Sequence, residues 1–573
     1  MRRRLTQSLA LVWEWGNRMR YRALALVLGM FVANAGAAEG GPTLLTASRI
    51  HTMDVATPVA TAMAYDADGR ILALGNVETL ARRYPDATRI DAGNATVIPG
   101  LIDAHGHLGD LGETQLIADL VGAGSKAEVL DRLRAFASKN PGEGWLLGNG
   151  WDQNDWDEKQ FPSAADLDAL FPQRPVWLLR VDGHAGWANT AALRAIGRDL
   201  SGDWHPDGGK VLREGAGKPT GILVDSAMNL IDAVRPAADA AHLERVLALG
   251  MQAAVAAGLT GVHDAGVPLA EMQAYQRLAD RGAMPLRVYA LADGNKEALD
   301  WLCRDGLYRH ADGRLQMRAV KLFADGALGS RGAAMLEDYS DDHGNRGLLV
   351  MSADELAAAA AKAKRCGVQV GTHAIGDRGN RLSLDTYAKA LGKDAGSDHR
   401  WRIEHAQVLS LQDLPRLADM GVIASMQPTH ATSDMPWAEE RVGAARIAGA
   451  YAWRQMRDAG VRLALGSDFP VESVEPRLGL YAAVTRADAS GKPVGGWLPG
   501  EKLTAYEALR GFTLDAAYAG FAETEVGSLE VGKRADFVIL AEDPLAVPDA
   551  QLRTLHVRAT YVDGKQVFAA PAQ

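Results

Sequence analysis

Val97–His107, with the sequence VIPGLIDAHGH, is an apolar run that ends in two histidines separated by one glycine. Residues two apart point to the same face of a β-strand, so this run would present His105 and His107 side by side. Imidazole is a common ligand for zinc and related divalent metals. A turn that happens to hold two histidines is the alternative interpretation. The pattern predicts a strand that ends in half of a metal site.

Four residues further along the chain are candidates to complete this site. Each lies at or near the end of a short apolar or alternating run, and they are Lys321, His373, His405 and Asp468. The C-terminal ends of successive strands converge at the mouth of a parallel barrel, where such barrels keep their active sites. We therefore expect these four side chains to meet the histidine pair.

The spacing of the candidates favours an α/β protein built as a (β/α)8 TIM barrel. A βα unit takes about 30 residues when an eight-unit barrel takes about 250, and the four later candidates then fit strands four, five, six and eight. The interval between His107 and Lys321 exceeds three units by on the order of a hundred residues. We predict a barrel domain over 99–496 with a large insertion after barrel strand 1, at roughly 108–240.

Short β-type runs separated by turn residues occur near both ends of the chain, for example at 71–75 and 557–567. Such runs are typical of small all-β units. We expect residues 39–98 and 497–573 to pair into one composite β-sandwich that flanks the barrel.

The first 38 residues have the composition of a secretory signal peptide. Arginines precede the apolar run 23–33, and small residues of the A-x-A type follow at 35–38. Export to the periplasm is therefore expected, with no membrane attachment after cleavage. An uncleaved anchor is the alternative, although the run is short for a membrane span. The long leader also makes Met19 an alternative start to Met1.

Composition excludes several classes of partner and ligand. The net charge of −10 over 573 residues provides no basic surface for nucleic acid. Cys303 and Cys366 are the only cysteines, so neither a disulfide framework nor a cysteine-rich zinc site is available. Metal ligands must then be histidines and oxygen donors. The expected partner is a small-molecule substrate, and a homo-oligomer is possible.

The motifs around the candidates resemble the amidohydrolase superfamily, and within it the amidohydrolase family 3 branch, which includes enzymes similar to N-substituted formamide deformylase. The resemblance covers nearly all of the mature chain. The segments that carry it are Pro99–His107, Lys321–Arg331, His373–Asp377, Ile403–Gln407 and Gly466–Val471.

This resemblance implies a metal-dependent hydrolase in which His105 and His107 form one ligand pair and His373 and His405 another. It also places Lys321 where binuclear members carry a carboxylated lysine, because an unmodified ammonium has no lone pair for a metal. An ion pair with a carboxylate is the alternative for Lys321. The ion is expected to be zinc by default, with one or two per chain.

Asp468 is the residue expected to bind metal and transfer protons. A carboxylate beside a metal-activated water can accept its proton and deliver it to the leaving group. An aspartate that only caps the following turn is the alternative. For a histidine such as His373 or His405, the alternative is a packed core residue.

A second set of residues is expected to contact substrate or to support the ligands: His184, His263, Asp264, Arg331, His430 and Trp151. Structural histidines are the alternative for His184 and His263. Trp151, together with Trp156, Trp187 and Trp204, is a candidate lining of an apolar pocket, although such aromatics often pack in a core.

The leading functional hypothesis is hydrolysis of a carbon–nitrogen bond in an amide, an N-acyl or N-formyl compound, or a cyclic amide. The same ligand set suits a deaminase or an esterase, because fold and metal do not fix the substrate. An exported binding protein without catalysis is the third hypothesis, and the complete ligand set argues against it.

Overall fold

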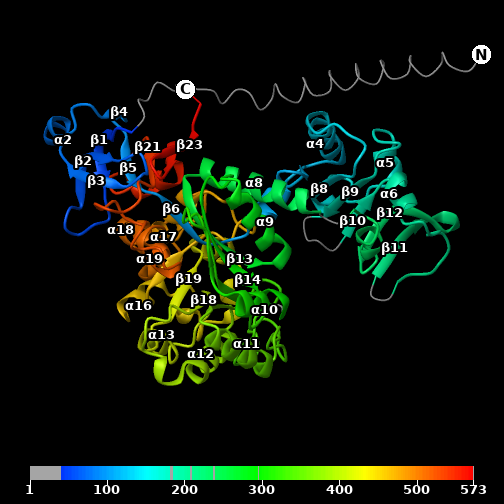
Figure 1. The fold of residues 1–573 in the computed structure, drawn as a ribbon. Coiled ribbons are helices and arrows are strands. Elements are labelled where there is room, and N and C mark those ends of the chain that lie inside the picture. Colours follow the sequence, from blue (N-terminus) through cyan, green and yellow to red (C-terminus); the bar gives the residue numbers. More distant parts are fainter. Residues whose placement is uncertain (1–39, 181–184, 207–208, 237–238, 295, 572–573) are drawn as a thin grey trace, which may run out of the picture.

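The computed structural model describes residues 40–571, apart from 181–184, 207–208, 237–238 and 295. The predicted signal peptide and His184 therefore lie outside the described residues. Parallel strands with helices between them form the centre of the molecule (Figure 1). In barrel order the strands are β6 (Leu101–Gly106), β13 (Leu259–Val267), β14 (Arg287–Asp293), β16 (Leu315–Phe323), β17 (Gln369–Ala374), β18 (Arg402–His405), β19 (Ile423–Met426) and β20 (Leu463–Leu465).

Backbone hydrogen bonds join the last strand of this sheet to the first. The amide of Asp468, just after β20, donates to the carbonyl of His105 at 2.7 Å, and the amide of His107 donates to Phe469 at 2.9 Å. The predicted (β/α)8 TIM barrel is confirmed, and Lys321, His373 and His405 lie on its fourth, fifth and sixth strands.

Helices cover the outside of the barrel (Figure 1). They include α8 (Ala240–Ala256), α9 (Leu269–Asp280), α10 (Lys296–Asp305), α11 (Ala353–Arg365), α12 (Asp377–Leu391), α13 (Leu414–Asp419), α16 (Trp453–Asp458) and α17 (Pro476–Thr485). The sequence of α11 shows why such helices form: Ser352 and Glu355 make a capping box at its start, and Leu356, Ala360 and Ala363 are buried on one face.

Strands from both chain ends form a single flanking sheet (Figure 1, blue and red). Its members are β1 (Thr43–His51), β2 (Val59–Tyr65), β3 (Ile71–Gly75), β4 (Thr88–Asp91), β5 (Thr96–Pro99), β21 (Phe537–Leu540), β22 (Val557–Val562) and β23 (Lys565–Ala569). The two ends meet where β5 pairs antiparallel with β21. Helix α2 (Val77–Arg83) packs on one face through Leu80.

Aromatic contacts show that this sheet curls around a shared core. Phe537 stacks on Tyr561 with 4.4 Å between ring centroids, and Tyr65 from the distant strand β2 lies 6.1 Å from Phe537. The C-terminal strands begin only at Phe537. Within the predicted range 497–573, helices α18 (Ala505–Gly511) and α19 (Leu514–Ala519) precede them, and α19 packs against Ile102 of the barrel.

The insertion forms a separate lobe beside the barrel (Figure 1, cyan to teal). Its sheet contains β7 (Ala118–Asp119), β8 (Leu146–Trp151), β9 (Val176–Arg180), β10 (Ala185–Ala188), β11 (Gly209–Glu214) and β12 (Lys218–Asp225), with helices α4 (Lys126–Lys139), α5 (Ala164–Asp168), α6 (Thr190–Ala195) and α7 (Asn229–Asp232). At its base, α3 (Leu108–Thr114) contacts α8 so closely that a Cβ on Gly112 would lie 1.8 Å from the carbonyl oxygen of Val246.

Cys303 of α10 and Cys366, which follows α11, form a disulfide with 5.1 Å between their Cα atoms. The sequence analysis did not predict this bond between neighbouring barrel helices.

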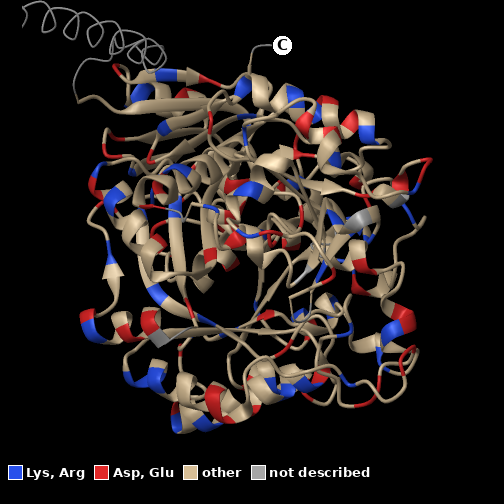
Figure 2. Ribbon diagram, turned by 90° about the vertical axis from the view of Figure 1, so that its right-hand side faces the viewer, with Lys and Arg blue, Asp and Glu red and all other residues tan. Residues whose placement is uncertain are grey.

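Lys and Arg alternate with Asp and Glu over the outer helices (Figure 2). In the described part of the chain, no helix combines the length and apolar character that a bilayer crossing requires.

Candidate metal centre

The six predicted metal-site residues come together at the C-terminal ends of the barrel strands. Nζ of Lys321 lies 2.9 Å from Nε2 of His105, and Nε2 of His107 lies 2.9 Å from Oδ1 of Asp468. The ring of His405 lies 4.8 Å from that of His105 and 4.6 Å from that of His373, measured between centroids. One compact cluster therefore holds all six side chains.

Oxygen acceptors fix the orientation of three of the four imidazoles. Nδ1 of His105 lies 2.6 Å from Oε2 of Glu404, Nδ1 of His107 lies 2.9 Å from the carbonyl of Ala265, and Nδ1 of His405 lies 2.9 Å from Oε1 of Gln427. In His105 and His405, donation from Nδ1 leaves the lone pair on Nε2, which is how ligating histidines are held in metal sites. Burial alone would lower the pKa of His107, but the hydrogen bond of its Nε2 to Asp468 raises it. This donor set fits a divalent metal.

His373 is held by its other nitrogen, because its Nε2 lies 3.4 Å from the carbonyl of Gly326. Its Nδ1 is then left with the lone pair. Burial, and secondarily the charge of Lys321, lower the pKa of His373 to about 3 and that of His105 to about 4. Both rings are therefore neutral at physiological pH, as metal ligands must be.

Lys321 is 2% exposed, and burial lowers the pKa of its amine to about 8. Its polar contact is with His105, and among the described residues no carboxylate lies within ion-pair distance of its Nζ. The ion-pair alternative for Lys321 therefore has no partner in this arrangement.

Asp468 is buried between imidazoles, in a left-handed backbone conformation with φ of 63°. Burial alone would raise the pKa of its carboxyl, but the hydrogen bond from His107 and the neighbouring imidazoles hold it well below its usual range. Two groups of three donors, each within 4.8 Å of one another, share this carboxylate: His105, His107 and Asp468, and His405, His430 and Asp468.

His430 lies on α14 (Pro428–Asp434), beside the cluster. Nε2 of Gln407 contacts its Nδ1 at 3.1 Å, so the ring's proton lies on Nε2 when the amide donates. That Nε2 is buried, has no hydrogen-bond partner among the described residues, and lies 3.5 Å from Oδ2 of Asp468. His430 therefore presents an unpaired donor to the site.

A buried ion pair that the sequence analysis missed supports the cluster from inside the barrel. Glu404 and Arg402 are both fully buried on β18, 2.8 Å apart, and Glu404 also holds His105. Arg402 in turn contacts the carbonyl of Ala104 and the Nδ1 of His263. The available signal was the alternation of Arg402 and Glu404, which places both side chains on the face that points into the barrel.

His263 and Asp264 lie away from the mouth of the cluster. His263 is buried inside the barrel. Its hydrogen bond is with Arg402 and not with a predicted metal ligand. The carboxylate of Asp264 accepts from the amide of Leu108 and the hydroxyl of Tyr275, at 3.0 and 2.6 Å. These bonds are structural.

The remaining predicted pocket residues are not brought to the cluster. Arg331 pairs with Asp341 at 2.7 Å on the loop after β16. Trp151 is fully buried in the insertion core, and its indole donates to the carbonyl of Leu178 at 2.9 Å. The pocket role predicted for Trp151 is therefore wrong, because its strand turns this position toward the packed face of the insertion sheet.

The same holds for the other insertion tryptophans. Trp156 and Trp187 join Trp151 in one apolar cluster, while the ring of Trp204 carries the guanidinium of Arg198 at 3.7 Å. Packing, rather than substrate contact, accounts for these aromatics.

A TIM barrel that gathers four imidazoles, a lysine and an aspartate at its strand ends defines a metal-dependent hydrolase site. The model of the amidohydrolase family matches residues 88–568, and the chain belongs to that family. It is 35% identical to YtcJ of Bacillus subtilis over 88% of this chain and 95% of that protein. It is 30% identical to N-substituted formamide deformylase of Arthrobacter pascens, over 90% of this chain and 96% of that protein.

A solved structure agrees with this assignment. The crystal structure of an uncharacterized metal-dependent hydrolase from Pyrococcus horikoshii superposes with a TM-score of 0.74 at 28% identity, covering 89% of this chain and 99% of that one. The fold, the family and the metal-dependent hydrolase class are therefore consistent with one another.

Proposed function

We propose that this enzyme hydrolyses a carbon–nitrogen bond in an amide, an N-acyl or N-formyl compound, or a cyclic amide. The observation that carries the proposal is the cluster of four oriented imidazoles around a buried carboxylate. The similarity to a formamide deformylase along nearly its whole length supports a carbon–nitrogen bond over an ester.

His105, His107, His373 and His405, with Asp468, would hold one or two divalent ions, with zinc as the default. A bound divalent ion polarises the substrate carbonyl and lowers the pKa of water. Asp468 accepts the proton from the attacking water and passes it to the leaving nitrogen. His430 donates from Nε2 to the substrate oxygen. Removing one such hydrogen bond lowers kcat by a factor of about 10²–10³.

We also propose that Lys321 is carboxylated. The neutral amine attacks carbon dioxide, a C–N bond forms, and one proton leaves for solvent, which gives a carbamate. Burial supports this step because it lowers the pKa of the amine to about 8 and so raises its unprotonated fraction. The carbamate supplies the oxygen donors that an ammonium lacks.

Lys321→Ala is expected to reduce metal content to about one ion per chain or less, with partial rescue by added short carboxylic acids. Mass spectrometry of the metals in purified protein measures this. Lys389→Ala, an exposed lysine on α12, is the control. Full metal content and full activity in Lys321→Ala would remove the carbamate from the proposal.

We propose that the protein is exported to the periplasm by residues 1–38. The disulfide between Cys303 and Cys366 supports export, because disulfides persist in oxidising compartments. Fractionation of cells expressing the full chain, with N-terminal sequencing of the product, tests this. A cytoplasmic product that retains residue 1 would contradict it.

The function itself is tested by metal analysis of mature protein purified without chelator, together with a panel of N-formyl amines, N-acyl amino acids, cyclic amides, amino-heterocycles and esters. We expect about two ions per chain and turnover confined to carbon–nitrogen substrates. Turnover of esters alone would contradict the proposal, and a metal-loaded protein without any turnover would favour a binding protein.

A further inference from the structure

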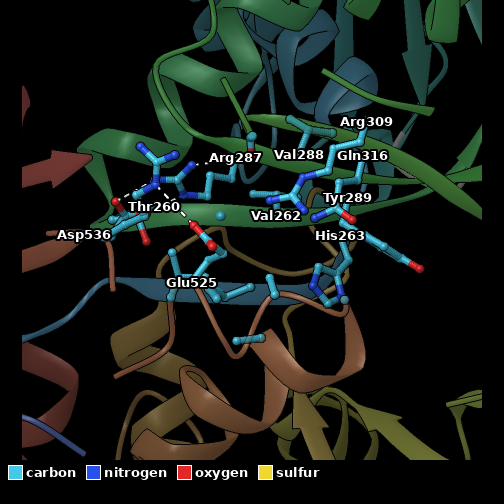
Figure 3. Close-up of a pocket in the computed structure, with 18 residues that line it drawn as sticks. Thr260, Val262, His263, Arg287, Val288, Tyr289, Arg309, Gln316, Glu525 and Asp536 are labelled. Carbon is cyan, nitrogen blue, oxygen red and sulfur yellow. Dashed lines mark hydrogen bonds and ion pairs between the residues drawn. The ribbon is translucent and has the colours of Figure 1, made fainter. Parts of the chain in front are cut away.

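A cavity of about 40 Å³ is shown in Figure 3. It lies toward the N-terminal ends of the barrel strands, whereas the metal centre lies at their C-terminal ends. Its walls come from the first halves of β13, β14 and β16 and from the segment after α19. One water needs about 10–15 Å³ of such space. The cavity therefore has room for about three waters, or for a small organic molecule of about four non-hydrogen atoms.

His263 lines the inner end of this cavity. Arg402 donates to its Nδ1 at 2.8 Å, and a guanidinium has no acceptor, so Nδ1 carries the lone pair and Nε2 the proton. Burial beside Arg402 holds the pKa of His263 well below its usual range, which keeps the ring neutral. No hydrogen bond to this Nε2 occurs within the described residues. Gly520 lets the ring approach the backbone closely, because a Cβ at that position would lie 2.7 Å from the nitrogen.

An unpaired positive charge lies at the mouth of the cavity. Arg309, on β15 (Tyr308–Arg309), is directly opposite Gln316 on β16, and both line the cavity (Figure 3). The other lining arginines are already paired: Arg287 with Asp536 at 2.7 Å, and Arg534 with Glu525 at 3.3 Å. Across 40–571, excluding the undescribed gaps, Arg309 forms no ion pair.

We propose that this cavity binds a small monocarboxylate of the size of acetate. The carboxylate accepts from Nε2 of His263, Arg309 supplies the compensating charge, and Gln316 supplies an amide donor. The methyl group packs on Ile102 and Val526, which line the same space. The site is separate from the metal centre and does not depend on the proposed reaction.

Titration of the full-length mature, metal-loaded protein with ¹³C-labelled acetate, followed by NMR, tests the site. We expect saturable binding that weakens at least tenfold in Arg309→Glu and in Gln316→Glu. Arg365→Glu makes the same charge change on the exposed surface of α11 and is expected to bind like the parent. Benzoate, which exceeds the cavity, is expected not to compete.

Three results would overturn the proposal: no saturable binding of acetate, binding that neither cavity variant weakens, or equal competition by chloride. The second result would assign acetate to the metal centre instead. Gly520→Ala fills the inner end without changing charge, and its backbone φ of −98° suits alanine. Loss of acetate binding is expected in this variant, together with a lowered unfolding temperature because the new Cβ displaces the buried His263 ring, and unchanged binding would exclude His263 as the inner contact.

Discussion

Asp468→Asn is expected to lower kcat by about 10²- to 10⁴-fold, the range that positioned acid–base groups contribute. The amide keeps the size of the carboxylate and an oxygen that can face a metal, but it cannot accept and return a proton. Metal content is therefore expected to stay near the parent value. Steady-state kinetics on the preferred amide, with metal analysis of the same preparation, measures both quantities.

A control separates lost chemistry from lost structure. Asp413 is equally buried but pairs with Arg381 and Arg416, at 2.8 and 2.9 Å, on the outer helices. Asp413→Asn is expected to reduce stability while leaving kcat within about threefold. Unchanged turnover in Asp468→Asn would refute its role in proton transfer, and loss of metal from that variant would attribute the lost turnover to its role as a ligand instead.

The barrel and the positions of the six site residues were predictable because each depends on a short local pattern. An apolar run that ends in a polar residue fixes the end of a strand, and parallel strand ends must meet in a barrel. His105 of β6, His107 directly after that strand, and His405 of β18 follow from this rule. The length of the insertion followed from counting βα units.

What the sequence did not reveal depends on which distant elements become neighbours. The disulfide requires that α10 and α11 be adjacent, and the contact between Arg402 and His263 requires two strands to face each other across the barrel. Trp151 was misassigned because single-sequence patterns show that an aromatic is buried but not on which face of its sheet. His430 was predicted near substrate, yet only the structure shows its free donor beside Asp468.

Glu404→Gln is the second variant with a large expected effect. Glu404 holds His105 at 2.6 Å and pairs with Arg402 at 2.8 Å, and both members of the pair are fully buried. Removing one charge of a buried pair leaves the other uncompensated, which costs about 3–5 kcal/mol. Glu404→Gln also replaces the charged acceptor of His105 by a weaker, neutral one, and weakening the group that orients a ligating histidine lowers metal affinity by up to about 10- to 100-fold.

The effects on stability and on metal affinity can be separated, because stability depends on the Arg402–Glu404 ion pair and metal affinity depends on the contact between Glu404 and His105. Urea unfolding is measured on chelator-treated protein, so that metal binding does not add to stability. The double variant Arg402→Met/Glu404→Leu removes both buried charges and is expected to regain part of the stability lost in Glu404→Gln. Its metal affinity is expected to stay low, since leucine gives His105 no acceptor. Recovery of metal affinity in the double variant would show that Glu404 serves only to neutralise Arg402.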